Sequence, residues 1–398
     1  MKIVIFAHTP PPHHGQSFMV QLMLAGLGGD VRRAASGERR EIACFHVNCR
    51  VSTGVDDIGT LRFGKLLLLL RYCMEAIWCR LRHGVRTFYY VPAPGKRCAL
   101  YRDWLVMLLC RPFFPHLVLH WHASGLGAWL DGDGFAIERW ITQALLGRPA
   151  LSIALAEASS QDARWLHSQA IALVPNGIPD PCAEFDPSLL GLRRARTEER
   201  QRRCQEPVSA GETPLIFRVL YLAHCTREKG LFDALDGIAL FNCRPSPLRA
   251  HFTVAGTFMD AREESAFRER IARPDLAGAV TYAGFAAGDK KKSLFEESDC
   301  LCFPTYYPAE SFPLNLVEAA AYGLSAVVTR WRAIPEIQPP DYPGFVEPKA
   351  PAQIADALER LALTDLAEPL RARFLARFSE ASHMDQLREA ILSAESQG

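Results

Sequence analysis

The chain has 398 residues, of which 49% are hydrophobic and 22% are charged, and its formal net charge is +1. This length predicts two domains, and the composition is that of a soluble globular protein. The near-neutral charge gives no electrostatic case for a nucleic-acid-binding protein. The twelve cysteines form no Cys-x-x-Cys pair, and we interpret them as reduced cytosolic thiols.

Short β-rich runs alternate with helical patterns along the whole chain, which predicts parallel α/β sheets. In the first half, strands are predicted at residues 2–7, 42–47, 87–91, 116–122, 151–155 and 171–175. In the second half, they are predicted at residues 217–223, 251–256, 279–284, 300–305, 325–330 and 344–348. Two such sets predict two doubly wound, Rossmann-like domains.

Membrane and targeting signals are weak in this sequence. The first strand is followed by three prolines, which indicates a strand and a loop rather than a signal peptide. No apolar stretch reaches the ~20 residues of a transmembrane helix. The most apolar stretch, residues 66–70, has basic flanks. It fits an amphipathic helix touching a membrane surface or a buried helix with snorkelling arginines, and we favour the second. We expect a cytoplasmic protein, with peripheral contact at the inner face of the membrane as the variant.

The loop after the first strand reads Thr-Pro-Pro-Pro-His-His-Gly-Gln over residues 9–16, and a helix is predicted over 17–27. Gly15, followed by Gln16, would let the backbone approach a ligand closely. His13 and His14 have no Cys or acidic partner at metal spacing, so we interpret them as loop residues and predict no metal site.

The strand at residues 116–122 ends in His122, just before Gly125. A polar residue that leaves the carboxyl end of a central strand points into the ligand crevice of an α/β sheet. The alternative is a hydrogen-bonded structural histidine. His120, on the same face of the strand, competes for the role, and we favour His122 because it adjoins the loop.

A domain boundary is predicted at Val174-Pro-Asn-Gly-Ile178, because Pro, Asn and Gly together mark a turn. The predicted domains are residues 1–178 and 179–375, with a C-terminal helix at 376–398 that packs back on the first domain. Residues 185–214 are charged and irregular and include the arginine-rich run 193–203. This run fits an anionic partner site or a solvated helix or linker, and we favour the latter.

The strand at 217–223 leads into His224 and, further along the loop, the pair Lys229-Gly230. Lys229 would lie near the N-terminus of the next helix, where a cation opposes the helix dipole. Anionic oxygens nearby would remove that penalty, so a phosphate-binding lysine is one interpretation. A solvated lysine beside a turn glycine is the other.

The most informative window holds Glu310 and Glu318, eight positions apart. Pro313 suits the first helical position, and the run 314–322 is predicted as a helix that stops at Gly323. Glu310 would therefore lie in the loop before the helix and Glu318 inside it. Backbone N–H groups between them can receive a phosphate. The alternative is a surface glutamate plus a helix-face glutamate.

These features resemble the donor-site signature of retaining family-4 glycosyltransferases of the GT-B fold. The resemblance covers about residues 1–375. Its motifs are Glu310 and Glu318 with Ala319, Ala321 and Gly323 after them, Lys229-Gly230, Val174-Pro-Asn-Gly-Ile178 and Ile334-Pro-Glu-Ile337. The sequence departs from the family at three places, with Ala223-His224 for Gly-Arg, Gly15-Gln16 for Gly-Gly, and Arg332-Ala333 for two glycines.

The resemblance implies a GT-B-like fold, with two doubly wound domains facing a cleft. It also implies sugar transfer with retention from a nucleoside-diphosphate sugar on the second domain to a glycan, lipid-linked or small-molecule acceptor on the first. No cofactor or metal is implied. The catalytic residues it implies are Glu310, Lys229 and His122. The substrate-binding residues it implies are Gly15, Gln16, His224, Gly284, Phe285, Ser311, Phe312, Pro313, Leu314, Asn315 and Glu318.

Other functions fit parts of the sequence. A non-catalytic sugar-nucleotide-binding subunit fits the missing arginine and Gly-Gly pair, and a GT-B-fold phosphorylase or epimerase would share the fold. A Rossmann dehydrogenase is disfavoured, because no G-x-G-x-x-G follows the first strand.

Overall fold

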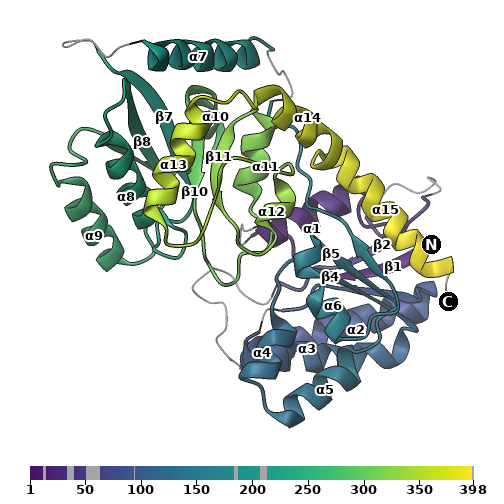
Figure 1. Ribbon diagram of the computed structural model, residues 1–398. Coiled ribbons are helices and arrows are strands. Elements are labelled where there is room, and N and C mark those ends of the chain that lie inside the picture. The colour runs from purple at the N-terminus through teal and green to yellow at the C-terminus, as the bar shows by residue number, and fades with distance from the viewer. Residues whose placement is uncertain are drawn as a thin grey trace. The chain divides into compact units, whose positions relative to one another are not determined.

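The computed structural model describes residues 1–11, 15–33, 40–50, 63–93, 95–182, 187–206 and 213–396. The chain forms two compact units, one of Met1–Asn176 with Ala381–Gly398 and one of Gly177–Glu380. Each unit contains a six-stranded parallel sheet with helices packed on it (Figure 1). The prediction of two Rossmann-like α/β sheets is therefore confirmed, and every predicted strand overlaps an observed one.

The first sheet has the strand order β2-β1-β3-β4-β5-β6. Its strands are β1 (Lys2–Phe6), β2 (Ala43–Val47), β3 (Thr87–Tyr90), β4 (His116–Trp121), β5 (Leu151–Ala154) and β6 (Ile171–Leu173). The chain runs from β1 to β2 on one side and then to β3 on the other, so the topology switches between β1 and β3. Open α/β sheets bind ligands outside the carboxyl ends of the strands at such a point.

Two layers of helices cover the first sheet. On one face, α1 (Gly15–Gly26) and α15 (Glu380–Ser396) share a buried cluster with β1; Met384, Leu387 and Ile391 of α15 lie in it. On the other face, α2 (Phe63–His83), α3 (Arg97–Cys110) and α5 (Ala136–Leu146) bury apolar side chains in a second cluster. The shorter elements of this unit are η2 (Arg111–Phe113), α4 (Leu126–Gly132), η3 (Glu157–Ser159) and α6 (Gln161–Trp165).

The second sheet has the order β12-β11-β10-β7-β8-β9. Its strands are β7 (Leu215–Leu222), β8 (Leu248–Ala255), β9 (Val280–Gly284), β10 (Cys300–Phe303), β11 (Ser325–Thr329) and β12 (Phe345–Val346). Its helices are α7 (Ser188–Gln205), α8 (Leu231–Asn242), α9 (Ala261–Ile271), α10 (Gly288–Glu297), α11 (Leu314–Ala321), α12 (Ile334–Ile337), α13 (Pro351–Ala362) and α14 (Ala367–Arg377). Here the topology switches between β7 and β10, which places a candidate site at the loops that follow these strands.

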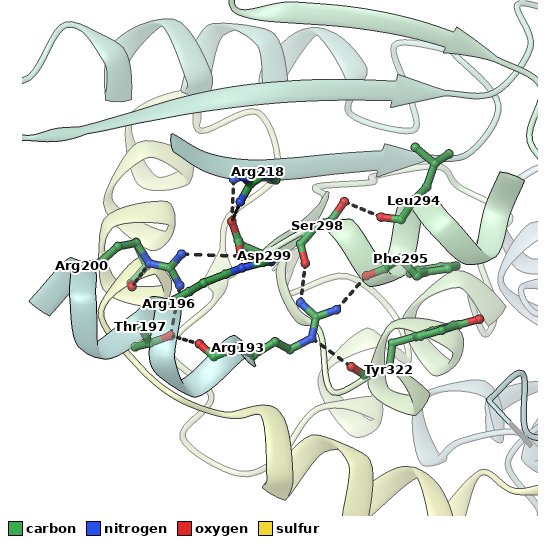
Figure 2. Close-up of polar contacts among 11 residues, drawn as sticks. Arg193, Arg196, Thr197, Arg200, Arg218, Leu294, Phe295, Ser298, Asp299 and Tyr322 are labelled. Atoms are coloured by element: carbon green, nitrogen blue, oxygen red, sulfur yellow. Dashed lines mark hydrogen bonds and ion pairs between the residues drawn. The ribbon is translucent and has the colours of Figure 1, made fainter. Parts of the chain in front are cut away.

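Within residues 185–214, which the sequence analysis describes as irregular, α7 forms a helix over Ser188–Gln205. Its arginine-rich run is neither a free anion site nor a fully solvated face, because Arg193 and Arg200 are only 6% and 5% exposed. The guanidinium of Arg193 donates to the carbonyl oxygens of Phe295 (2.7 Å), Tyr322 (3.2 Å) and Ser298 (Figure 2). These carbonyls lie where α10 and α11 end, so one buried cation fastens α7 to two other helices.

The second buried arginine of α7 completes this polar cluster. Nε of Arg200 donates to the carbonyl of Ala362 at 2.8 Å. The Asp299 carboxylate, only 1% exposed, pairs with Arg196 at 3.1 Å and with Arg200 at 3.6 Å (Figure 2). Burial lowers the pKa of Arg193 to about 10, so its guanidinium is still charged at neutral pH. Arg193 and Arg200 therefore hold α7 against the rest of the second unit.

No described helix is both long enough and apolar enough to cross a membrane.

Candidate functional site

The loop after β7 carries Lys229 to the carboxyl edge of the second sheet. Gly230 is the N-cap of α8 and has a left-handed backbone, with φ of 79°. A Cβ at this position would lie 2.3 Å from the carbonyl oxygen of Pro304, so only glycine fits between the two loops. The loop that follows β7 can therefore lie directly against the loop that follows β10.

This close approach brings Lys229 and Glu310 together. Nζ of Lys229 donates to Oε2 of Glu310 at 2.6 Å, and the two side chains are 17% and 10% exposed. The Thr305 hydroxyl lies 3.4 Å from the same carboxylate oxygen, and the Tyr307 ring lies 4.7 Å from Nζ. Lys229 and Glu310, two of the three residues that the resemblance implies are catalytic, thus form one partly buried ion pair, 81 positions apart in the chain.

Glu318 forms a second ion pair, with a residue that the sequence analysis did not single out. Nζ of Lys291, in α10, donates to Oε1 of Glu318 at 2.5 Å. Burial raises the pKa of Glu318, and the positive charge of Lys291 opposes that rise. The sequence held one signal for this residue. Lys291 belongs to a run of three lysines, residues 290–292, that begins six residues after Gly284, where the predicted strand ends.

The neighbouring lysine in this run, Lys290, holds the end of β9. Its Nζ donates to the carbonyl oxygens of Ala283 at 2.5 Å and Phe285 at 3.2 Å. Gly284 has φ of 66°, which turns the chain at the strand end. The Phe285 side chain is 69% exposed, so its ring belongs to the surface rather than to the core.

His224 stands where the resemblance leads us to expect an arginine. Its Nδ1 lies 3.5 Å from the Thr257 hydroxyl, and its carbonyl accepts from the Tyr221 hydroxyl at 2.8 Å. Partial burial and the charge of Lys229 lower the pKa of His224. The imidazole is therefore neutral at pH 7, and it can donate or accept a hydrogen bond but supplies no positive charge.

The first turn of α11 differs slightly from its prediction. Pro313 is the N-cap, with φ of −70° and ψ of 114°, so the helix begins at Leu314 and Pro313 lies one position before it. The Asn315 side chain donates to the carbonyl of Leu222 at 2.9 Å, which ties this turn to the end of β7. Ser311 is half-buried, and Phe312 is 6% exposed, with its ring centroid 6.0 Å from that of Phe378. The Phe312 side chain therefore packs in the interior.

In the first unit, the structure distinguishes the two histidines of β4 by their contacts. His120 is 1% exposed and its Nδ1 contacts the Tyr89 hydroxyl. Burial holds the pKa of His120 well below its usual value, so the ring is neutral. His122 follows the strand end, is 9% exposed, and lies 4.1 Å from His120 between ring centroids. His120 is therefore the more deeply buried of the two, and His122 lies just after the end of the strand.

Gly15 and Gln16 open α1 rather than preceding it, since this helix spans Gly15–Gly26. Gly15 is exposed and Gln16 is half-buried. The predicted loop residues His13 and His14 lie outside the described residues. Within the described ranges, His, Cys, Asp and Glu residues form no group of three or more that could hold a metal ion.

Residues 216–364 match the model of the family Glycosyl transferases group 1. This segment includes Lys229, Lys291, Glu310 and Glu318. Part of the chain is 30% identical over 148 residues to the amylovoran biosynthesis glycosyltransferase AmsK of Erwinia amylovora, covering 35% of this chain and 34% of that protein. A second relative, the putative colanic acid biosynthesis glycosyltransferase WcaL of Escherichia coli (strain K12), is 28% identical over 169 residues, which is 40% of each chain. The matched segments thus span about a third to two fifths of these relatives.

Solved structures resemble the chain over nearly its whole length. HepE of Anabaena, in complex with UDP and glucose, has a TM-score of 0.63 at 17% identity and covers 98% of this chain and 99% of its own. Sucrose-phosphate synthase of Thermosynechococcus elongatus has a TM-score of 0.66 at 16% identity, with both chains covered completely. At these identities the likeness establishes the fold, which is that of GT-B glycosyltransferases.

Proposed function

We propose that the protein is a retaining glycosyltransferase that moves a sugar from a nucleoside-diphosphate sugar to a glycan or lipid-linked acceptor in polysaccharide assembly. The observation that carries this proposal is the pair of lysine–glutamate contacts, Lys229–Glu310 at 2.6 Å and Lys291–Glu318 at 2.5 Å. The first pair lies at the loops after β7 and β10, where the topology of the second sheet switches. The matched family segment and the polysaccharide-related relatives support the same activity.

In this proposal, charge on the leaving diphosphate is neutralised by Lys229 and by the backbone N–H groups at the start of α11, without a metal ion. Fixed donors aimed at developing charge commonly make the largest contribution to catalysis. Lys229 would move from the carboxylate of Glu310 toward the phosphate oxygens when donor binds. Glu310 would then be released to accept hydrogen bonds from hydroxyls of the donor sugar.

Glu318 would accept hydrogen bonds from the ribose hydroxyls, because an ionised carboxylate is an acceptor at both oxygens. His122, on the first unit, would orient the acceptor or the transferred sugar. We propose no covalent intermediate. A uridine nucleotide is the first donor class to test, because HepE was solved with UDP and glucose.

A second candidate function is a non-catalytic subunit that binds sugar nucleotides. One observation favours it: His224 is neutral at pH 7, whereas the resemblance leads us to expect a permanent cation at this position. Such a subunit would bind the nucleotide without turning over any donor.

The deciding experiment combines binding with turnover on the full chain. We would first record thermal shifts with UDP, GDP, ADP and CMP, where a ligand at ~100 times its Kd adds about 2.7 kcal/mol of stability. We would then measure nucleotide release from the matching sugar donor. The glycosyltransferase proposal predicts a shift with one diphosphate and release that requires an acceptor.

The alternatives give different results in the same assays. A shift without turnover, over a range of glycan and lipid-linked acceptors, would favour the binding subunit. Turnover that requires inorganic phosphate would indicate a phosphorylase, and conversion of the donor alone would indicate an epimerase. If no nucleotide shifts the melting temperature, and if Glu318→Gln leaves nucleotide binding unchanged, the assignment of the site is overturned.

A further inference from the structure

Arg332 occupies a backbone position that favours glycine. Its φ is 48°, and Ala333 follows with φ of −81° and ψ of −4°. The N–H of Ile334 donates to the carbonyl oxygen of Trp331 at 3.0 Å, so residues 331–334 form a β-turn. A positive φ at the first central residue and a negative φ at the second is the type II′ pattern, in which glycine is the usual first residue.

An arginine at this position costs free energy that a glycine would not. The left-handed region crowds the Cβ of every other residue type, and the resemblance leads us to expect two glycines at Arg332 and Ala333. The chain thus has a glycine-like backbone at residue 332 with a long cationic side chain on it. Backbone strain of this kind is concentrated at functional sites, so the guanidinium is the feature that needs an explanation.

The turn lies at the carboxyl edge of the second sheet. Strand β11 ends at Thr329, and it pairs in parallel with β10, which ends at Phe303 (Figure 1). The loops that follow the two strands therefore leave the sheet at the same edge, where α/β sheets bind their ligands. The loop after β10 is the one that carries Glu310.

Hydrogen bonds join the turn to the loop of Glu310. The carbonyl oxygen of Tyr307 accepts from the indole Nε1–H of Trp331 at 2.9 Å and from the backbone N–H of Glu310 at 3.0 Å. The Tyr307 ring lies 4.7 Å from Nζ of Lys229. Tyr307 therefore contacts both members of the Lys229–Glu310 ion pair as well as the residue that precedes Arg332.

The backbone on both sides of Arg332 is fixed. The indole bond holds the residue before it, and Ala333 and Ile334 after it are 1% and 0% exposed. Arg332 itself is exposed, and its Cζ lies 5.8 Å from the centroid of the Trp331 ring. A guanidinium is thus presented from a fixed turn, beside the indole that is tied to the loop of Glu310.

We propose that Arg332 selects a donor sugar that bears a carboxylate, as a hexuronic acid does. The inference rests on the proposed function, in which Lys229 neutralises the diphosphate and Glu310 accepts from hydroxyls of the sugar. Arg332 is tied to the loop of Glu310, so its guanidinium would meet the sugar. The planar fork of arginine matches a carboxylate with two parallel hydrogen bonds, whereas a neutral hexose offers it no anion.

An acidic sugar also needs a cation here for an electrostatic reason. Its carboxylate would lie near Glu310, and two like charges at short range repel each other. Lys229 would be engaged with the diphosphate once the donor is bound. The charge of Arg332 would offset the repulsion, while a neutral sugar could lie beside Glu310 without any such compensation.

The experiment compares acidic and neutral donors that share a nucleotide, by calorimetry on the full chain. The pairs are UDP-glucuronic acid with UDP-glucose, and GDP-mannuronic acid with GDP-mannose, and UDP and GDP alone are the references. We expect the acidic member of one pair to bind more tightly than the neutral member. Arg332→Gln and Arg332→Gly should each weaken binding of that acidic donor at least ~10-fold and leave the neutral donor and the free nucleotide almost unchanged.

Arg330→Gln is the matched control. Arg330 is an exposed cation two residues away, with its Cζ 4.5 Å from the Phe345 ring centroid and its Nε 4.0 Å from the Glu347 carboxylate, so its loss should leave the preference intact. Arg332→Lys keeps the charge without the fork and should retain only part of the affinity. Because glycine suits the turn, Arg332→Gly should melt at or above the wild-type temperature, so its loss of affinity would not reflect a loss of folding.

Three outcomes would overturn the inference. If the acidic donor binds no more tightly than its neutral partner, Arg332 does not select a carboxylate, and the proposed function still stands. If the Arg332 variants bind free UDP or GDP as weakly as they bind the acidic donor, the guanidinium holds the diphosphate instead. If none of the six ligands binds, the inference fails, and the proposed function fails with it only if ADP and CMP also give no thermal shift.

Discussion

Nζ of Lys291 lies 2.5 Å from Oε1 of Glu318, so the carboxylate that we propose binds the ribose already has a cationic partner within the protein. Burial favours the protonated acid, and the lysine favours the ionised form. Lys291 thus opposes the protonation of Glu318, whose side chain is only 20% exposed.

Lys291→Met should make nucleotide binding sensitive to acid. Burial then raises the pKa of Glu318 without opposition, so the carboxylate is protonated at a higher pH than in the wild type. As the pH is lowered, UDP affinity measured by calorimetry should begin to fall at a higher pH in the variant than in the wild type. Lys292→Met, at an exposed position of the same helix, is the matched control.

Protein stability provides a second measurement on Lys291→Met. A carboxyl group whose folded pKa lies above its unfolded value binds more protons in the native state. Its contribution therefore stabilises the fold at low pH and is lost as the pH rises from about 4.5 through the raised pKa. The variant should gain more melting temperature on acidification than the wild type. Identical pH profiles would show that the lysine does not set the ionisation of Glu318.

Lys229→Ala should lower kcat by about 10²-fold or more, the effect of removing one fixed donor from developing charge, with a smaller effect on melting temperature. The comparison is with Arg227→Ala, an exposed cation of the same loop whose guanidinium lies 4.2 Å from the Phe232 ring centroid. Turnover should be measured at saturating donor. Undiminished turnover in the Lys229 variant would remove this lysine from the mechanism.

Arg193→Met should destabilise the second unit by roughly 2–5 kcal/mol, because three carbonyl groups lose a buried charged donor. Arg202→Gln, on the same helix, removes a surface cation paired with Glu199 and Glu206 and should leave stability almost unchanged. Chemical denaturation of both variants tests the difference. Equal stabilities would mean that the buried cluster in Figure 2 does not anchor α7.

The sequence predicted the sheets well and the side-chain partners poorly, for physical reasons. Runs such as residues 300–305 are apolar because parallel strands are buried on both faces, so hydrophobicity alone locates them. Arg193 looks solvated in the sequence, since its partners are carbonyl groups a hundred residues away. The contact of Lys291 with Glu318 likewise depends on how α10 packs beside α11, which no local pattern encodes.

The position of His224, where the family that the sequence resembles has an arginine, yields the last prediction. Partial burial and Lys229 lower the pKa of this histidine, so this loop has one permanent cation, whereas the resemblance leads us to expect two. His224→Arg restores a charge that no physiological pH removes. If a diphosphate binds here, a charge-assisted hydrogen bond of about 1.5–3 kcal/mol should tighten UDP binding at least tenfold.

The same substitution brings two like charges together in the ligand-free protein, so its melting temperature without UDP should fall slightly while the shift on adding UDP grows. His251→Arg makes the same chemical change within β8, four residues before the end of that strand, and should alter neither quantity. Calorimetry and thermal shifts on both variants would separate the two positions. If affinity for UDP were unchanged or weaker in His224→Arg, the diphosphate would have to lie away from the loop after β7, and the assignment of Lys229 would fall with it.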